Sequence, residues 1–177
     1  SAAAQVADVI SRASEFAPLF ALVNNASIFE QFNWQETSLE QWNHTMMVNL
    51  TAPFLLSQAF ARSLEPDGTG RIVNLLDWRA LRPGIGSLAY TVSKSGLAAL
   101  TRSLAIALAP RINVNGLALG AILPPSSGEP ARIKLEQIPA RRWADLAEVD
   151  QAAIFLLDGP AYITGEIIHI DGGRHLV

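Results

Sequence analysis

The sequence predicts an α/β protein built on a doubly wound parallel sheet, in which helices cover both faces of the strands. Short apolar runs alternate with stretches of helical periodicity along the whole chain. The runs are almost continuously apolar, as in strands that are buried on both faces, and each one ends in polar residues or glycine. The 177 residues suffice for one domain with a substantial core, so we treat residues 1–177 as a single domain.

Four apolar runs are expected to be strands, over residues 20–23, 71–76, 112–119 and 166–170. They lead into Asn24-Asn25-Ala26-Ser27, Asp77, Gly120 and Asp171-Gly172-Gly173, respectively. In open parallel sheets, ligands bind beyond the carboxyl ends of the strands. These polar residues and glycines are therefore expected to converge on one crevice.

Five segments between the runs have helical character: residues 2–13, 38–48, 53–64, 90–109 and 147–157. The turn sequence Pro66-Asp67-Gly68 follows the third segment, and Pro110 stops the fourth. Asp145 and Glu148 occupy capping-box positions at the start of the fifth. Strands and helices thus alternate, as a doubly wound sheet requires.

The composition of the chain limits which ligands and surfaces it is expected to bind. Half of the residues are hydrophobic, 16% are charged and the net charge is −3, which argues against a nucleic-acid or anionic-membrane surface. The chain has no cysteine, and His44, His169 and His175 lack metal-ligand spacing, so we expect no metal site. The uncharged stretch 112–128 is too polar and too interrupted by Pro and Gly to span a bilayer. Charged residues break up the first 15 residues, unlike a signal peptide, and a cytoplasmic location is expected.

Tyr90 and Lys94 stand one helical turn apart, so their side chains project from the same helix face. A free tyrosine has a pKa near 10 and is a poor acid–base catalyst at neutral pH. A neighbouring ammonium group stabilises the phenolate and is expected to lower that pKa. The spacing is also common on solvated helices, so the meaning of this pair depends on the residues around it.

Several motifs together resemble the short-chain dehydrogenase/reductase family. They are Asn24-Asn25-Ala26-Ser27, Asn49 within Val48-Asn49-Leu50, Tyr90-x-x-x-Lys94 with Ser93 before the lysine, and the ending Ile163-Thr164-Gly165-Glu166 followed by Asp171-Gly172-Gly173. The resemblance extends from Phe20 to the end of the chain. It implies a Rossmann-like fold.

The resemblance also implies roles for these residues. Tyr90 would be the general acid during reduction, Lys94 would lower its pKa and bind the nicotinamide ribose, and Asn49 would hold a water that links Lys94 to solvent. NADP(H) is the implied cofactor, with NAD(H) left open. Its expected contacts are Asn24, Ala26, Ser27, Tyr90, Lys94, Leu119, Gly120, Ala121 and Ile122.

Asp77 departs from the common family pattern, because most members have a serine thirteen residues before the tyrosine. An aspartate at this position is similar to the pteridine-reductase branch, which includes dihydromonapterin-type reductases. In that branch an aromatic residue such as Phe29 stacks on the pterin. Ser27, Phe29, Asp77 and Tyr90 are the implied substrate contacts. A carboxylate suits a substrate rich in N–H donors, and it can relay a proton to a ring nitrogen as hydride reaches the adjacent carbon, so Asp77 is also a candidate catalytic residue. The alternative is a lineage substitution, or an N-cap for the turn that follows.

The sequence contains no G-x-G-x-x-G motif. The family carries this phosphate-binding turn, and the residue that chooses between NAD and NADP, in strand–helix units that precede the strand at 20–23. Because the chain also begins with Ser1, we expect the working protein to be longer by roughly 60 to 90 residues.

Other interpretations stay open at this point. Asn49 could be a helix-kink residue near Pro53, Phe29 could belong to the core, and Trp78 could be a lid or a packing residue. The segment 123–130 reads equally as a substrate loop or an ordinary surface loop. The helix at 90–109 is apolar on more than one face, and with the resemblance this implies a homodimer or homotetramer.

Three functions are therefore compared. The first is reduction of a pterin-like small molecule by NADPH, and the second is a carbonyl or alcohol dehydrogenase of the same family. The third is a non-enzymatic scaffold made of this chain alone.

Overall fold

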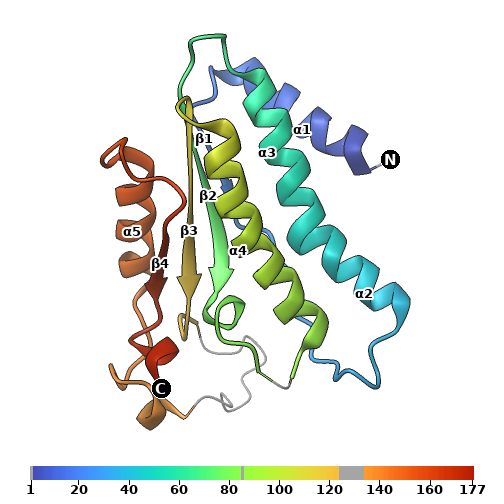
Figure 1. Cartoon of the computed structure of the whole chain (residues 1–177), viewed down its shortest axis with the longest axis vertical. Helices are drawn as coiled ribbons and strands as arrows, with labels where there is room; N and C mark the ends of the chain where they lie inside the picture. Colours follow the sequence, from blue (N-terminus) through green and yellow to red (C-terminus); the bar gives the residue numbers. More distant parts are fainter. Residues whose placement is uncertain (1, 85, 124–133) are drawn as a thin grey trace.

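A computed structural model describes residues 2–84, 86–123 and 134–177 (Figure 1). Its centre is a parallel sheet of four strands in chain order, β1 (Ala21–Asn24), β2 (Gly70–Asp77), β3 (Ile112–Leu119) and β4 (Ile167–Ile170). Each strand lies within one residue of its expected start and end. The predicted α/β fold with a parallel sheet is confirmed.

The register of the sheet determines where the carboxyl ends of the strands lie relative to one another. Asp77 pairs with Leu119, and Leu119 pairs with Ile170, so these three strand ends are level. β1 stops earlier, because its last residue, Asn24, pairs with Asn74 inside β2. The loop after β1 therefore begins three residues below the end of β2.

Within the described residues, five α-helices and four shorter helical turns precede, connect or follow the strands. They are α1 (Ala2–Phe16), α2 (Leu39–Met46), η1 (Met47–Thr51), α3 (Ala52–Ser63), η2 (Trp78–Ala80), α4 (Leu88–Leu108), η3 (Leu135–Gln137), α5 (Leu146–Asp158) and η4 (Arg174–Leu176). All five predicted helices are present. α1 ends three residues later than expected, and α4 begins two residues earlier.

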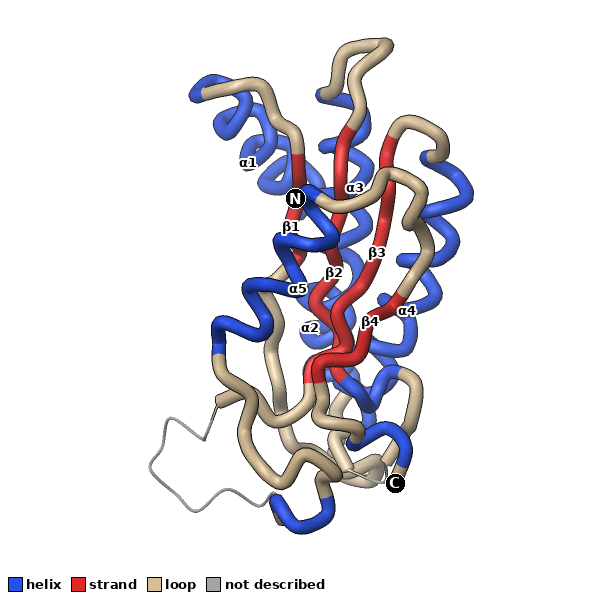
Figure 2. The backbone as a smooth tube through the Cα atoms, turned by 90° about the vertical axis from the view of Figure 1, so that its left-hand side faces the viewer, coloured by secondary structure: helices blue, strands red, loops and turns tan. Residues whose placement is uncertain are grey.

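Helices α3 and α4 lie on one face of the sheet and α5 lies on the other (Figure 2). The alternation of side chains along β2 explains this arrangement. Ile72 and Leu76 face α3 and α4, whereas Val73 and Leu75 belong to the cluster that packs against Leu156 of α5. Both faces of the central strands β2 and β3 are thus buried, as their continuous hydrophobicity predicts, whereas Val23 of the edge strand β1 is 43% exposed.

The sequence predicted separate helices at 38–48 and 53–64, but the structure joins them through η1, a π-helical turn. The Ala52 N–H bonds to the Met47 carbonyl, five residues back. Pro53 follows at once and has no N–H, so its place in the first turn of α3 costs only the hydrogen bond that the Asn49 carbonyl would otherwise accept. The chain therefore continues without a break and carries Asn49 inside the π turn.

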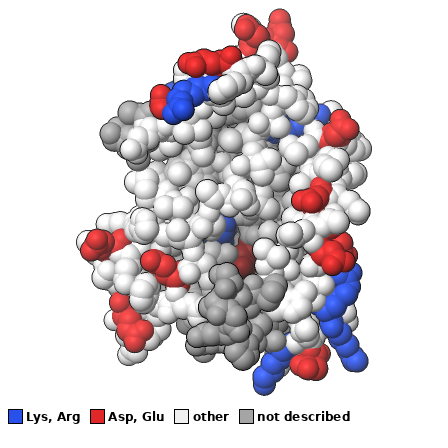
Figure 3. Space-filling view, turned by 180° about the vertical axis from the view of Figure 1, so that it is seen from behind, with Lys and Arg blue, Asp and Glu red and all other residues white. Residues whose placement is uncertain are grey.

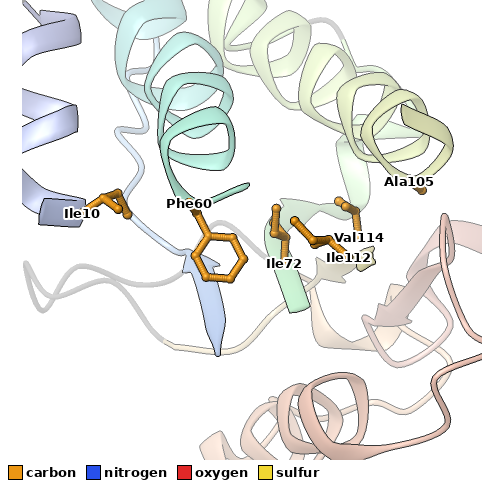
Figure 4. Close-up of a cluster of buried hydrophobic side chains, with 6 residues drawn as sticks. All are labelled: Ile10, Phe60, Ile72, Ala105, Ile112 and Val114. Atoms are coloured by element: carbon orange, nitrogen blue, oxygen red, sulfur yellow. The ribbon is translucent and has the colours of Figure 1, made fainter. Parts of the chain in front are cut away.

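The largest core cluster lies towards the amino ends of the strands. Figure 4 shows Ile10, Phe60, Ile72, Ala105, Ile112 and Val114 converging from α1, α3, α4 and the sheet. Burial of these side chains fixes the helices at one end. The carboxyl ends of the strands are left for polar groups.

The face seen in Figure 3 is mostly uncharged: basic and acidic side chains lie mainly near its margins, and a small area of each sign is visible near its centre. Leu88, Val92 and Ile106 of α4 are exposed, as an oligomer contact would require, and the oligomeric state stays a prediction. None of the helices in the described ranges has the length and apolar character needed to cross a bilayer.

Candidate active site

Tyr90 and Asp77 meet at the carboxyl end of β2. Asp77 is the last residue of this strand, and Tyr90 lies in the first turn of α4. The Tyr90 hydroxyl donates a hydrogen bond of 3.1 Å to Oδ2 of Asp77. Thirteen residues of chain separate the two groups, and the turn η2 brings them together.

Asp77 is also the N-cap of η2. Its Oδ1 accepts the Arg79 N–H at 2.8 Å, and the Arg79 guanidinium lies 3.3 Å from Oδ2 and 3.4 Å from Oδ1. The N-cap interpretation of Asp77 is therefore correct, and it does not exclude a role in the site. The same carboxylate caps the turn η2, forms an ion pair with Arg79 and accepts a hydrogen bond from the Tyr90 hydroxyl.

Lys94 is buried one turn after Tyr90 on α4 and is 3% exposed. Its ammonium group donates to the Leu75 carbonyl of β2 at 2.7 Å and lies 5.9 Å from the centre of the Tyr90 ring. Burial lowers the pKa of Lys94 to about 8, against the opposing attraction of Asp77. Both members of the predicted pair thus line the same region.

The pKa of Tyr90 is raised, which is opposite to the expected direction. The largest cause is burial, and the negative charge of Asp77 and its hydrogen bond add to it, while Arg79 opposes the shift. The sequence placed a cation beside Tyr90 but gave no distance to Asp77. In this structure the tyrosine is held as a protonated donor.

Aromatic rings border this group. The rings of Phe29 and Tyr90 meet edge to face with centroids 4.7 Å apart. Phe29 is 48% exposed, so the interpretation of Phe29 as a core residue is wrong. The guanidinium carbon of Arg79 lies 5.7 Å from the Phe29 ring and 5.1 Å from the Trp78 ring. Trp78 packs between charged side chains at the edge of the site.

Asn49 joins the loop after β1 to α4 and is fully buried. Its side-chain oxygen accepts from the Ile28 N–H at 2.9 Å and the Ser27 hydroxyl at 3.2 Å. Its amide donates to the Ile28 carbonyl and to Ser93, next to Lys94, at 2.9 and 3.1 Å. The Asn49 side chain thus holds the loop at Ser27 and Ile28 against Ser93 of α4. The Asn49 main-chain carbonyl loses its usual helical donor, because Pro53 has no N–H.

Asn24 points into the fold. Its amide donates to Asn74 at 2.8 Å and lies 3.4 Å from the Ser57 hydroxyl. Its side-chain oxygen is buried without a partner in the part of the chain that the structure describes. Ala26 and Ser27, by contrast, are exposed beyond the strand. Ala26 and Ser27 were both predicted to contact the cofactor, and both are accessible to a ligand.

Leu119, Gly120, Ala121 and Ile122 follow from β3 beside Asp77, as the register requires. A side chain on Gly120 would lie 2.6 Å from the Asp171 Cα, so this close approach requires glycine. Ala121 borders a cavity of about 320 Å³ that reaches to His169 and Gly173. Most of the predicted loop 123–130 lies outside the described residues.

Arg79 and Arg174 were missed from the sequence. Arg79 could have been noticed as a basic residue two positions after a carboxylate at a strand end. No site role was predicted for Arg174, because its neighbour Trp78 is far away in the chain. Within the described ranges, no three His, Asp or Glu side chains gather as a metal ion would need.

Known proteins are similar to this chain over most of its length. A family model described as enoyl-(acyl carrier protein) reductase matches residues 1–175. The 3-oxoacyl-(acyl-carrier-protein) reductase FabG of Aquifex aeolicus is 39% identical over 158 residues, which are 86% of this chain. The 2-dehydro-3-deoxy-D-gluconate 5-dehydrogenase of Bacillus subtilis is 35% identical over 160 residues, again 86% of this chain. The chain spans only 64% and 63% of the lengths of these two relatives.

Solved structures are similar across the whole chain. FolM alternative dihydrofolate reductase 1 from Brucella suis, in complex with NADP, superposes with a TM-score of 0.93 at 33% identity. The match covers 100% of this chain and 72% of that protein. The homologous FolM from Brucella canis, also with NADP, gives a TM-score of 0.89 at 34% identity, over 97% of this chain and 69% of that one.

Proposed function

The chain belongs to the short-chain dehydrogenase/reductase family, and from this premise we propose that the intact protein is an NADPH-dependent reductase of pterin-like substrates. The observation that carries the proposal is the contact between the Asp77 carboxylate and the Tyr90 hydroxyl at 3.1 Å. A carboxylate beside the proton donor suits a substrate that presents N–H groups, as reduced pterins do. The FolM proteins named above support this substrate class.

The groups on α4 fit a nicotinamide cofactor. An ammonium group has three donors, and the Leu75 carbonyl accepts one of those of Lys94 at 2.7 Å. Lys94 is therefore suited to bind a ribose hydroxyl beside Tyr90. Ala26 and Ser27 would contact the cofactor from the loop after β1, and Gly120 to Ile122 from the loop after β3. When bound, NADPH supplies the hydride.

Tyr90 supplies the proton. In the structure its hydroxyl is protonated and donates to Asp77. An N–H group of the substrate would replace Tyr90 as the hydrogen-bond donor to Asp77. The Tyr90 O–H would then be released towards the substrate ring nitrogen that is protonated as the adjacent carbon is reduced.

Lys94 and Asn49 support this transfer. The ammonium group of Lys94 stabilises the phenolate that remains on Tyr90 after the proton has left. Asn49 holds the loop at Ser27 against Ser93, which fixes α4 relative to the strand ends. A water on the Asn49 main-chain carbonyl would return a proton through Lys94.

Substitution of Asp77 by serine tests the proposal. The variant restores the residue most family members have and removes the carboxylate. We expect kcat/KM for dihydromonapterin or dihydrobiopterin to fall by about 10²-fold, because the N–H acceptor is lost. NADPH oxidation at 340 nm measures the change in the intact protein. Unchanged pterin turnover would remove Asp77 from the mechanism.

Reduction of a simple carbonyl compound is the second candidate. Two matched relatives are named as a 3-oxoacyl-(acyl-carrier-protein) reductase and a 2-dehydro-3-deoxy-D-gluconate 5-dehydrogenase, and their identities of 39% and 35% support this second candidate. Turnover of ketones without turnover of pterins by the unaltered protein would select it.

A further inference from the structure

We propose that Arg174, together with Trp78 and Arg79, forms a subsite for an anionic group on the substrate, a carboxylate or a phosphate. The inference extends the proposed function, since it assumes that a substrate ring binds beside Tyr90. We refer to these three residues as the arginine–tryptophan subsite. Its geometry is independent of which ring is reduced.

Arg174 reaches the site from the far end of the chain. It begins η4, after the turn that follows β4, and its guanidinium carbon lies 4.3 Å from the Trp78 ring. The guanidinium carbon of Arg79 lies 5.1 Å from the same ring. Trp78 follows Asp77 directly, so Arg174 stands one aromatic ring away from the residues that contact Tyr90.

The two arginines differ in how their charge is balanced. Arg79 is paired with Asp77 at 3.3 Å. Arg174 has no carboxylate within 4.0 Å among the residues that the structure describes. It is half-buried beside a second cation, and its pKa is lowered by burial first and by Arg79 second, although Asp77 and Asp171 act in the other direction. An arriving anion would relieve this repulsion and meet a partly desolvated partner.

The backbone around Arg174 is held before any ligand arrives. The buried Asp171 carboxylate accepts the N–H groups of Gly173 and His175 at 2.9 and 2.8 Å and lies 2.9 Å from the His175 ring. Arg82 donates to the Arg174 carbonyl at 3.2 Å. Such pre-organisation reduces the entropy that binding would cost. Asp171 is occupied by these bonds and is a poor competitor for the Arg174 guanidinium.

The subsite predicts the shape of the substrate. The reducible ring would lie against Phe29 and Tyr90, whose rings are in contact. A side arm of this ring would extend past Trp78 and end in a negative charge at Arg174. Pterins with an acidic tail therefore fit better than pterins with a short neutral one.

Three substrates separate the possible sources of the charge. Dihydrofolate carries carboxylates, dihydroneopterin monophosphate carries a phosphate, and dihydromonapterin carries neither. For Arg174→Gln in the intact protein, we expect the ratio of kcat/KM for an anionic substrate to kcat/KM for dihydromonapterin to fall about tenfold. The anionic substrate whose ratio falls identifies the group. Arg174→Lys should restore part of the loss, because the charge returns without the planar fork.

Controls make the test specific. Arg102→Gln removes the same charge from an exposed position on α4 and should leave the ratio unchanged. Thermal unfolding of Arg174→Gln establishes that the variant is folded. A ratio that is equal in Arg174→Gln and the unaltered protein for both anionic substrates would overturn the subsite.

A binding measurement keeps the subsite separate from the proposed reaction. Calorimetry with p-aminobenzoylglutamate, which has the acidic tail but no pterin, needs no turnover. Binding that weakens about tenfold in Arg174→Gln supports the subsite even if no pterin is reduced. Equal affinity in both proteins, or no binding to the unaltered protein, would overturn it.

Discussion

Two buried polar clusters lie in the carboxyl half of the sheet and differ in the kind of group they use. We call the first the amide cluster: Asn24, Ser57, Asn74 and Thr101, which are neutral and join β1, β2, α3 and α4. We call the second the ionic cluster: Asp77, Arg79, Tyr90 and Lys94. Both are largely shielded from water. The pKa of Tyr90 is raised and that of Lys94 is lowered.

The difference separates folding from chemistry. Neutral amides and hydroxyls hold strands to helices at a modest cost in desolvation, because each of them can be paired by hydrogen bonds. Ionisable groups cost more to bury, and a fold retains them where a proton has to be moved. The amide cluster should therefore control stability, and the ionic cluster should control activity.

The largest expected effect comes from Tyr90→Phe, which removes the proton donor. We expect kcat/KM to fall by about 10³-fold with the preferred substrate. The unfolding free energy should change by less than about 1.5 kcal/mol, since Arg79 remains as a partner of Asp77. Steady-state kinetics and urea unfolding measure the two quantities.

Tyr162→Phe is the matched control, because Tyr162 is the other tyrosine of the chain and is 100% exposed. It should leave both quantities unchanged. If Tyr90→Phe lost stability but kept its activity, Tyr90 would act like a member of the amide cluster. The division between a cluster for stability and a cluster for activity would then be wrong.

The next effect is on stability. Asn74→Ala removes the Asn74 side-chain oxygen, which accepts from Asn24 at 2.8 Å, and its amide, which donates to Thr101 at 2.9 Å. We expect the unfolding free energy to fall by about 3 kcal/mol, since two buried groups lose a partner and a void is left. The protein that remains folded should retain kcat/KM within about threefold.

Asn113→Ala provides the comparison within the same sheet. Asn113 is also buried but donates to a single carbonyl, that of Ala161, at 3.0 Å. Its replacement should cost about 1 kcal/mol. Equal losses in the two variants would show that the amide cluster has no collective effect.

The smallest expected effect is a dependence of the unfolding free energy on pH. Folded Lys94 releases its proton near pH 8, whereas the unfolded chain keeps it to a pKa near 10.5. Between these values the unfolded state binds more protons, so stability should rise with pH relative to a Lys94→Met variant. The rise should approach about 1 kcal/mol per pH unit. Urea unfolding of the cofactor-free protein at pH 8, 9 and 10 measures it.

Lys134, the other lysine of the chain, is exposed and serves as the control. A Lys134→Met variant should follow the unaltered protein across this range. If the Lys94→Met profile also runs parallel to the unaltered one, burial of Lys94 has no energetic consequence.

Much of the fold was predictable, because periodicity reports burial and burial determines which segments pair. The strands and the level of Asp77 in the sheet follow from it directly. Asn24 shows where this reasoning fails. A polar residue at a strand end looks like a ligand in sequence, and here it bonds to Asn74 inside the fold.

The electrostatics could not be predicted in the same way. The direction of the Tyr90 pKa shift depends on a 3.1 Å contact with Asp77 and on burial, neither of which spacing reveals. Arg174 was missed for a related reason, because 96 residues of chain separate it from Trp78 and only the tertiary fold brings them together. Helix continuity through η1 was missed because Pro53 usually marks a boundary.

The π turn Met47–Thr51 has a consequence for how this chain tolerates changes in length. A π turn contains one residue more than regular α-helix needs. Deletion of one residue there would leave an unbroken α-helix whose two sides keep nearly the same relative rotation, because five residues of a π turn and four of an α-helix both make slightly more than one turn. What such a deletion would remove is the wide turn that carries Asn49 towards Ile28 and Ser93. Elsewhere on a helix, the loss of one residue rotates one side by about 100° relative to the other; here the change would be confined to Asn49 and its hydrogen bonds.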